Sequence, residues 1–240
     1  MADIATQVSA SLDSLTREFD IIAHNMANVS TAGFKRRCNS FTQALEAQEG
    51  GAAGEEGPPP SVFDFSQGSL VETGRTLDFA LSGKGFFVLE SPDGPLYTRH
   101  GIFVTNPNGQ VVDTAGRFVA GMSGPVLVPA SVDPAQVSVG SDGRIRAGQA
   151  EIGQFRIVEF AGQEDQLVPA GLNCFRAPTG VEPVDAADAM IKQGYQEASN
   201  VKLVEELVHM IVVSRLYEAN MKLLAVSRDN SSSTISVAMG

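Results

Sequence analysis

The side chains best suited to acid–base chemistry in this chain are carboxylates in its middle part. Asp78, Glu90, Asp93, Asp113 and Asp142 fall in a stretch rich in strand and turn signals. Two carboxylates held close together are the arrangement of glycoside hydrolases, so a cell-wall glycosidase is one function to consider. However, Asp93 and Asp142 stand in turn sequences that favour aspartate for backbone reasons. Asp78 alternates with strand residues and is expected to face solvent. We therefore predict that the protein is not an enzyme.

Histidines and cysteines do not strengthen the case for chemistry. His24, His100 and His209 stand apart without the spacing of metal ligands, and His24 falls on the solvated side of its predicted helix. Cys38 and Cys174 are too few for a disulfide framework. The sequence leaves open one bridge in an oxidising compartment or two unreactive thiols. We expect no metal and no cofactor.

Charge and hydropathy restrict the class of partner. The 240 residues carry a net charge of −11, which argues against binding to a nucleic-acid backbone. One dense basic cluster, Lys35, Arg36 and Arg37, is interpreted as a solvated helix end or turn. The N-terminus lacks the basic start and apolar run of a secretory signal, and no window has the length and apolarity of a membrane span. We expect no nucleic-acid partner, no membrane insertion and no cleavable signal peptide.

The elements that must position any site are two amphipathic helices at the ends of the chain. Both repeat apolar residues at alternating steps of four and three, the pattern of a coiled-coil seam, with Ser214 as a gap in the second helix. The first helix is predicted to end within residues 28–33, and the second to begin near residues 198–200 with Asn200 or Ser199 as its cap. The predicted assembly seam is Val8, Leu12, Leu15, Phe19, Ile22, Met26, Val29, Leu203, Leu207, Met210, Tyr217, Met221 and Leu224.

The second helix is also apolar off its seam over residues 201–213. A helix that is apolar on most sides is normally covered on most sides, and we expect other subunits to cover this one. Beyond residue 224 the run 228–233 consists of poor helix formers. The sequence leaves open whether this end is frayed or lines a polar lumen.

Between the helices the apolar period changes to two. Short strand-like runs lie at 77–81, 86–89, 102–104, 111–112, 118–119 and 155–158, separated by Gly, Asn and Asp turn signals. The Gly-rich and Pro-rich stretch 50–60 is typical of a linker. We predict an α+β protein with paired N- and C-terminal coiled-coil-type helices and a central antiparallel β-rich domain. Its predicted parts are a terminal helical assembly domain (1–36 and 195–240), connecting segments (37–65 and 177–194) and a β-rich outer domain (66–176).

Three stretches of the chain together resemble the bacterial flagellar rod and hook axial proteins. They lie at residues 25–35, 68–109 and 193–218, so both ends and the middle contribute to the match. Each stretch alone is weak, but all three in this order are specific. The residues that carry the family motif are Asn25, Asn28, Ser30, Thr31, Gly33, Phe34, Gly83, Gly85, Phe86, Asn200, Glu205 and Glu218.

The resemblance implies a structural subunit of the flagellar basal-body rod. Such proteins leave the cell through the flagellar export apparatus without a cleavable signal peptide. Their terminal helices pack with other rod and hook axial proteins in a helical homo- or hetero-assembly, with the β domain outside. The assembly is the periplasmic drive shaft that passes torque from motor to hook.

Within that family, the stretches 124–129 and 137–143 look most like the proximal-rod member that adjoins the distal rod. The alternatives are a distal-rod or short hook-type axial protein of the same family. From other classes, a secreted stalk or adhesin, or the glycosidase considered above, remains as a competing hypothesis.

Overall fold

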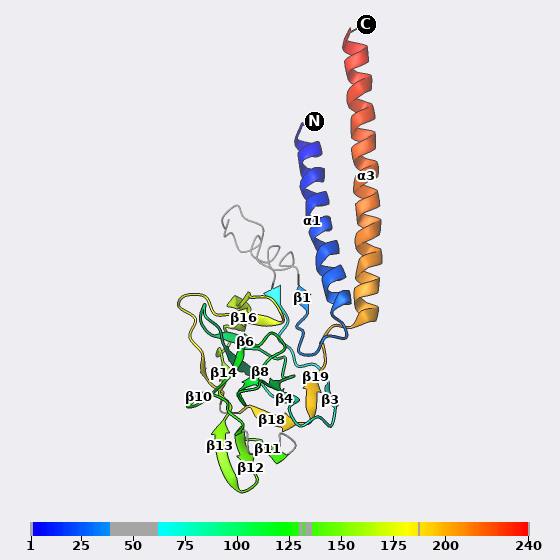
Figure 1. Ribbon diagram of the computed structural model, residues 1–240. Coiled ribbons are helices and arrows are strands. Elements are labelled where there is room, and N and C mark those ends of the chain that lie inside the picture. The colour runs from blue at the N-terminus through cyan, green and yellow to red at the C-terminus, as the bar shows by residue number, and fades with distance from the viewer. Residues whose placement is uncertain (1, 39–61, 130–131, 133–135, 187, 240) are drawn as a thin grey trace. The chain divides into compact units, whose positions relative to one another are not determined.

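The computed structural model describes residues 2–38, 62–129, 132, 136–186 and 188–239 (Figure 1). The predicted linker 50–60 and most of the predicted connecting segment 37–65 lie outside the described residues. Side chains are described from residue 6 to residue 226 of that set. The chain divides into two compact units. We call them the helical unit (Met1–Ala27, Arg37–Ser61 and Val201–Gly240) and the β unit (Asn28–Arg36 and Val62–Asn200).

The helical unit contains two long helices that lie side by side (Figure 1). Helix α1 spans Ala2–Ala27 and α3 spans Leu203–Met239, while β1 (Arg37–Cys38) follows α1 in the chain. The predicted end of the first helix is confirmed. Helix α3 begins later than predicted and continues through the poor helix formers at 228–233. Neither helix is long and apolar enough, over the residues that the structure describes, to span a membrane.

The β unit holds the remaining strands, and most of them are short because turns interrupt the period-two pattern every few residues. They are β2 (Val62–Phe63), β3 (Leu70–Glu72), β4 (Phe79–Ser82), β5 (Phe86–Glu90), β6 (Leu96–Thr98), β7 (Val104–Thr105), β8 (Val111–Val112), β9 (Phe118–Gly121), β10 (Gly124–Pro125), β11 (Val137–Val139), β12 (Arg144–Ala147), β13 (Ala150–Gln154), β14 (Ile157–Glu159), β15 (Val168–Pro169), β16 (Cys174–Arg176), β17 (Val184–Asp185), β18 (Met190–Gln193) and β19 (Tyr195–Glu197). A 3₁₀ turn, η2 (Glu164–Gln166), precedes β15.

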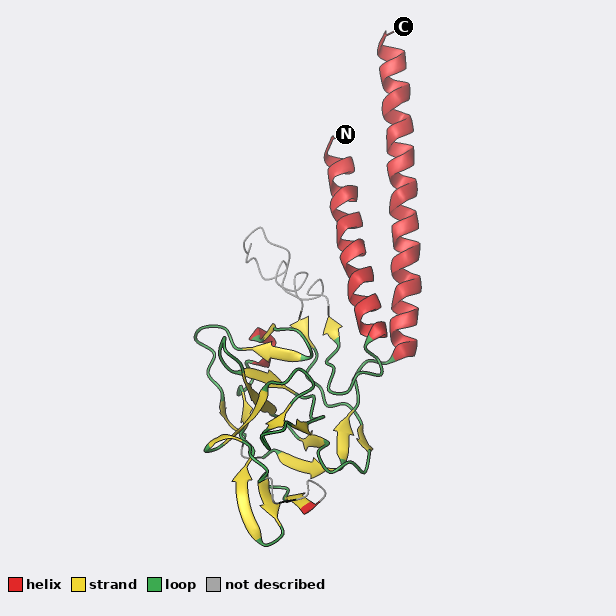
Figure 2. Ribbon diagram, viewed as in Figure 1, coloured by secondary structure: helices red, strands yellow, loops and turns green. Residues whose placement is uncertain are grey.

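The main sheet of the β unit is antiparallel throughout its described pairs. Its strands follow the order β15-β16-β6-β5-β9-β8-β7, with β10 paired to β9 and β14 paired to both β5 and β17. Strands β11, β12 and β13 form a separate three-stranded sheet that protrudes from the β unit (Figure 2). The predicted central antiparallel β-rich region is confirmed.

Two further strand pairs draw the C-terminal part of the chain into the β unit. Strand β18 pairs with β4 along four residues, Met190↔Ser82 to Gln193↔Phe79, and β19 pairs with β3. As a result the compact unit extends beyond the predicted domain 66–176, both to residue 200 and back to residues 28–36. The reason is that β4 pairs with β18, which lies in the predicted connecting segment, and β3 pairs with β19, which lies in the predicted helical assembly domain.

The core of the β unit consists of two groups of aromatic and aliphatic side chains. One group centres on Phe79, Phe87, Phe103 and Phe155, whose rings pack edge-on or tilted at centroid distances of 5.0–6.3 Å. The other group includes Phe63, Phe86, Tyr97, Phe160 and Phe175. Edge-to-face packing of aromatic rings adds to the free energy gained by burying them. This core holds the loops and strands that carry the polar groups described next.

Candidate functional site

Helix α3 presents an apolar surface to solvent on most of its circumference. Val204 is 73% exposed, Ile211 is 55% exposed and Leu223 is 59% exposed. The other large apolar side chains of α3 that are exposed are Leu203, Leu207, Val208, Val212, Leu216, Met221 and Val226. Contiguous apolar surface of this kind marks a site of protein–protein contact. We call these ten residues the α3 apolar surface.

A narrower face of α3 packs against α1 within the helical unit. Phe19 of α1 meets Tyr217 of α3 edge-on, with ring centroids 6.3 Å apart. Asn220 lies nearby and its amide donates to the Ser11 hydroxyl at 3.4 Å. The less exposed positions of α3, up to residue 226, are Glu206, Met210, Val213, Ser214, Tyr217, Asn220 and Leu224. Three of these seven are polar or charged and one is aromatic, so the contact is mixed rather than uniformly aliphatic.

The predicted seam residues divide between these two faces. On α1, Val8, Leu12, Leu15, Phe19 and Met26 are half-buried and Ile22 is buried, and Val29 beyond α1 is half-buried. On α3, Met210, Tyr217 and Leu224 are half-buried, whereas Leu203, Leu207 and Met221 are 41–47% exposed. A coiled-coil geometry for the helix pair stays a prediction.

Asn25 links three parts of the helical unit through its side-chain amide. It is fully buried, and its Oδ1 accepts the Arg37 N–H at 2.8 Å while its Nδ2 donates to the Arg37 carbonyl at 2.9 Å. The same Nδ2 donates to Oε2 of Glu206, also fully buried, at 3.4 Å. One amide therefore pairs with a strand residue as a neighbouring strand would, and it also contacts the first turn of α3.

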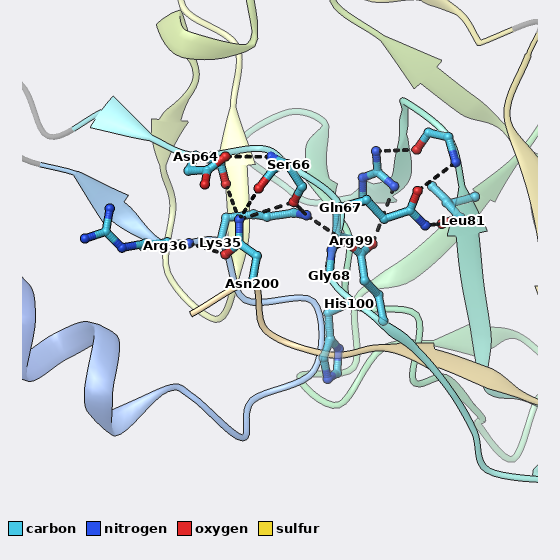
Figure 3. A network of polar contacts seen from close by, with 12 residues as sticks. Lys35, Arg36, Asp64, Ser66, Gln67, Gly68, Leu81, Arg99, His100 and Asn200 are labelled. Carbon is cyan, nitrogen blue, oxygen red and sulfur yellow. Dashed lines mark hydrogen bonds and ion pairs between the residues drawn. The ribbon is translucent and has the colours of Figure 1, made fainter. Parts of the chain in front are cut away.

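The β unit contains a group of buried charges from three distant parts of the chain (Figure 3). We call Lys35, Arg99 and Glu197 the ion centre. Lys35 Nζ lies 2.7 Å from Glu197 Oε1, and Arg99 NH1 lies 3.4 Å from Glu197 Oε2. The three side chains are 1%, 5% and 0% exposed, respectively. The interpretation of Lys35 as a solvated residue is wrong, because its ammonium is enclosed and paired.

Backbone groups complete the ion centre. Lys35 also donates to the Ser66 carbonyl at 2.6 Å, and Glu197 Oε1 accepts the Gly68 N–H at 2.9 Å. Arg99 donates to the Gly83 carbonyl at 2.7 Å. Burial lowers the pKa of the Lys35 ammonium and of the Arg99 guanidinium, while the Glu197 carboxylate opposes both shifts. The three charges are therefore buried away from water, and each cation is compensated by its pairing with Glu197.

Three amide side chains of the β unit replace missing backbone partners. Gln67 accepts the Gly83 N–H at 3.1 Å and donates to the Leu81 carbonyl at 2.9 Å. Gln193 accepts the Val139 N–H and donates to two carbonyls, those of Val137 and Thr76. Like Asn25, each amide thereby bonds backbone N–H and C=O groups of a strand or loop in the way that a neighbouring strand would.

Asn200 is the third of these amides. Its Oδ1 accepts the Arg36 N–H at 2.7 Å and its Nδ2 donates to the carbonyls of Asp64 and Ser66 (Figure 3). The predicted role of Asn200 as the cap of the second helix is wrong, because its amide is engaged with these segments and α3 begins at Leu203.

The other family-motif residues serve the turns around the ion centre or lie on α3. Gly33 has a φ of 65°, and a Cβ there would lie 2.5 Å from the His100 nitrogen. Gly83 and Gly85 have φ values of 98° and 128°, which L side chains rarely adopt. Phe34 and Phe86 are buried, the Thr31 hydroxyl donates to the Asn28 side chain, and Ser30 is exposed. On α3, Glu205 pairs with Lys202 at 2.9 Å and Glu218 is exposed.

The carboxylates considered for catalysis are described here by their burial and their partners. Asp78 is 1% exposed, so the expectation that it faces solvent is wrong. Asp113 accepts backbone N–H groups of its own turn and pairs with Arg117 at 2.6 Å. Over the described residues, no three acidic, histidine or cysteine side chains group as metal ligands. Neither Cys38, which is half-buried, nor Cys174, which is buried, is in a disulfide, and burial raises the pKa of Cys174.

Comparison with known proteins agrees with this geometry. Residues 192–237 match the family described as "Flagellar basal body rod FlgEFG protein C-terminal", and residues 80–147 match "Flagellar hook protein FlgE/F/G D1 domain". The "Flagellar basal-body rod protein FlgF" of Caulobacter vibrioides is 34% identical over 230 residues, 92% of each chain. The "Flagellar basal-body rod protein FlgG" of Bacillus subtilis is 33% identical over 88% of this chain and 89% of its own. That of Agrobacterium fabrum is 32% identical over 92% and 94%.

The chain belongs to the flagellar rod and hook axial protein family. It is a structural protein of the basal-body rod type, and the family is not one of enzymes. The first matched region runs from the second half of β18 through β19 and most of α3, and the second runs from Ala80 in β4 to the end of β12. Lys35, Arg99 and Glu197 lie within the resembling stretches 25–35, 68–109 and 193–218, but no sequence pattern indicated that they pair with one another. The opposite charges near the two ends were the available signal.

Proposed function

We propose that the protein is a subunit of the proximal flagellar rod, held in the rod by the α3 apolar surface packing against neighbouring subunits. The observation that carries the proposal is the exposure of that surface in a single chain. Its apolar side chains face several directions around the helix, and α1 covers only one face. Burying several such side chains at each contact supplies the free energy that assembly requires.

The rest of the proposal follows from family membership. The chain reaches the periplasm through the flagellar export apparatus and contacts other axial proteins above and below it. The terminal helices form the inner tube and the β unit lies outside. Such a tube transmits torque because its subunits are packed at the density of a protein interior and do not yield.

Charged substitutions on the α3 apolar surface test the assembly. Val208→Asp and Ile211→Asp each place a carboxylate where a neighbour packs, and an unpaired buried charge costs several kcal/mol per subunit. We expect cells carrying either variant to lose swimming and intact basal bodies, as seen by electron microscopy. The purified variants should melt like the unaltered protein, because both sites are exposed in the monomer.

The matched control is Lys222→Gln, which changes a charged and exposed residue of the same helix. It should leave swimming intact. Normal basal bodies in both aspartate variants would contradict the assembly role of the α3 apolar surface. The position along the rod needs a separate observation. Basal bodies from a strain that lacks the protein should have no distal rod if it lies proximally, and a proximal stub if it lies distally.

A further inference from the structure

The ion centre joins parts of the chain that are far apart in sequence. Lys35 and Glu197 are 162 positions apart, and Arg99 and Glu197 are 98 positions apart. Lys35 comes from the N-terminal piece of the β unit, Arg99 follows β6, and Glu197 is the last residue of β19. Glu197 is the carboxylate that pairs with both cations, so both lose this counter-charge whenever β19 is out of place.

Each member of the ion centre depends on the others because water is excluded. Among the residues that the structure describes, Arg99 Nε has no hydrogen-bond partner. Its charge is compensated by Glu197 through Nη1, by the Gly83 carbonyl and by the Phe86 ring, whose centroid lies 5.5 Å from the guanidinium carbon. Without Glu197, the Lys35 ammonium would keep its bond to the Ser66 carbonyl and the weaker attraction of the Asp64 carboxylate. Removing one member of a buried ion pair leaves an uncompensated charge, which is strongly destabilising.

Backbone contacts around the ion centre also join the N-terminal and C-terminal pieces of the β unit. The Gly33 N–H donates to the Glu197 carbonyl at 2.7 Å, and the Ala198 N–H donates to the Ser69 carbonyl at 2.8 Å. A Cβ on Gly68 would lie 2.0 Å from the Ala198 carbonyl oxygen, so the two segments touch without room for a side chain. Asn200 then ties residue 36 to residues 64 and 66. The segments 33–36, 64–69 and 197–200 therefore surround one set of charges.

We propose that the ion centre is a folding latch: the β unit closes only when its N-terminal piece, residues 28–36, and its C-terminal piece, residues 190–200, are both in place. Before closure, β3 and β4 lack their partners β19 and β18. Burial of Arg99 and Lys35 is then unfavourable, because their charges would lose water without gaining the Glu197 carboxylate. After closure, the chain passes directly from residue 200 into the segment that begins α3. The latch thus makes a stable β unit depend on nearly the whole chain and prevents a stable partial fold.

Hydrogen exchange of the full-length protein in increasing denaturant tests the latch without any substitution. Segments 33–36, 66–69, 97–100 and 195–198 should open together, with one dependence on denaturant, because they share one set of charges. If 33–36 or 195–198 opens in a separate step while the other segments stay closed, the latch does not exist.

Substitutions in the full-length chain then test whether the charges hold the latch. Glu197→Gln should speed exchange in all four segments together, by roughly 100- to 1,000-fold, because two cations lose their counter-charge. Lys35→Met combined with Glu197→Gln should cost much less than the product of the two single effects, because the substitutions remove the same interaction. Arg144→Gln is the control, since its pairs with Asp142 and Glu151 are half-exposed, and exchange should stay unchanged.

Acceleration limited to residues next to position 197, or single effects that simply multiply, would overturn the role of the charges. If Glu197→Gln does not fold, the denaturant series on the unaltered protein still decides whether the four segments form one unit. Neither measurement involves assembly, so failure of the latch and failure of the proposed rod function are distinguishable.

Discussion

The two units treat charged and apolar side chains in opposite ways: the β unit encloses charged side chains, and the helical unit exposes apolar ones. In the β unit a lysine, an arginine and a glutamate are enclosed, each at most 5% exposed, and the apolar side chains of its two core groups are buried. In the helical unit valines, leucines and an isoleucine of α3 are 41–73% exposed. The β unit therefore pairs its buried charges within one chain, whereas α3 keeps a large exposed apolar area, which we propose that neighbouring chains cover.

This difference separates stability from assembly. Changes inside the β unit should alter the folding of the isolated protein, and the same changes on α3 should leave that folding intact. Residues that belong to the same family motif thus have different physical roles. Gly33 and Asn200 complete a self-contained fold, while Glu205 and Glu218 lie at the surface of a helix that is completed by its neighbours.

The strongest test of the closed packing in the β unit is Gly101→Ala. An added Cβ would lie 1.9 Å from the Phe79 carbonyl oxygen, whose strand cannot move without displacing the core. We expect a loss of roughly 4 kcal/mol or more and no cooperative melt. Gly153→Ala in β13 is the control, because nothing lies within 4 Å of its added Cβ, and its melting temperature should hardly change. A stable, cooperative Gly101→Ala protein would contradict the close approach at this site.

A second test makes the same truncation in both units. Phe87→Ala removes a fully buried ring of the β unit and should cost about 3–5 kcal/mol in the free energy of unfolding. Ile211→Ala removes an apolar side chain that is 55% exposed on α3 and should change the monomer by about 0.5 kcal/mol or less. Denaturant unfolding of the monomers measures both. Equal losses would mean that the α3 apolar surface is already covered in the monomer.

A smaller effect distinguishes buried from exposed turn carboxylates. Asp113 is 4% exposed, accepts the N–H groups of Ala115 and Arg117 and pairs with the Arg117 guanidinium, so Asp113→Ala should cost about 2–3 kcal/mol. Asp142 accepts the Arg144 N–H in a similar turn but is 57% exposed, and Asp142→Ala should cost less than about 1 kcal/mol. Thermal melts compare the two. If Asp142→Ala lost more stability than Asp113→Ala, burial would not be what makes a turn carboxylate important.

The smallest expected effect is a pH dependence of the β unit. Burial lowers the pKa of His100 below 6.5, and the carboxylates of Asp113 and Asp78 only partly oppose this shift. As the pH falls through about 6.5, the unfolded chain binds a proton at His100 that the folded chain does not bind, so stability decreases. His100→Gln should flatten the decrease in melting temperature between pH 7.5 and 5.5. His209→Gln, a change on the exposed surface of α3, should not flatten the melt of the β unit, and identical slopes for all three proteins would refute the assignment to His100.

Strand periods and turn residues were predictable because they depend on neighbours in sequence. The runs at 86–89, 111–112 and 118–119 are strands β5, β8 and β9, and the first helix ends where Asn, Ser, Thr and Gly follow one another. Strands β18 and β19 were not predicted, because 190–197 is short and polar and gains strand structure only from pairing with β4 and β3. Asp78 was expected in solvent because alternation indicates which face a residue takes, and not whether another segment covers that face.

By itself, the sequence determined the two terminal helices, the β-rich middle and the membership of the flagellar axial family, since local periodicity and local motifs carry that information. Only the tertiary structure decided that Lys35 is buried, that Asn200 ties segments together rather than capping a helix, and that the β unit takes in residues 28–36 and 177–200. The physical reason is that the burial of a charge depends on its counter-charge. For Lys35 that counter-charge lies 162 positions away, where no local pattern reaches.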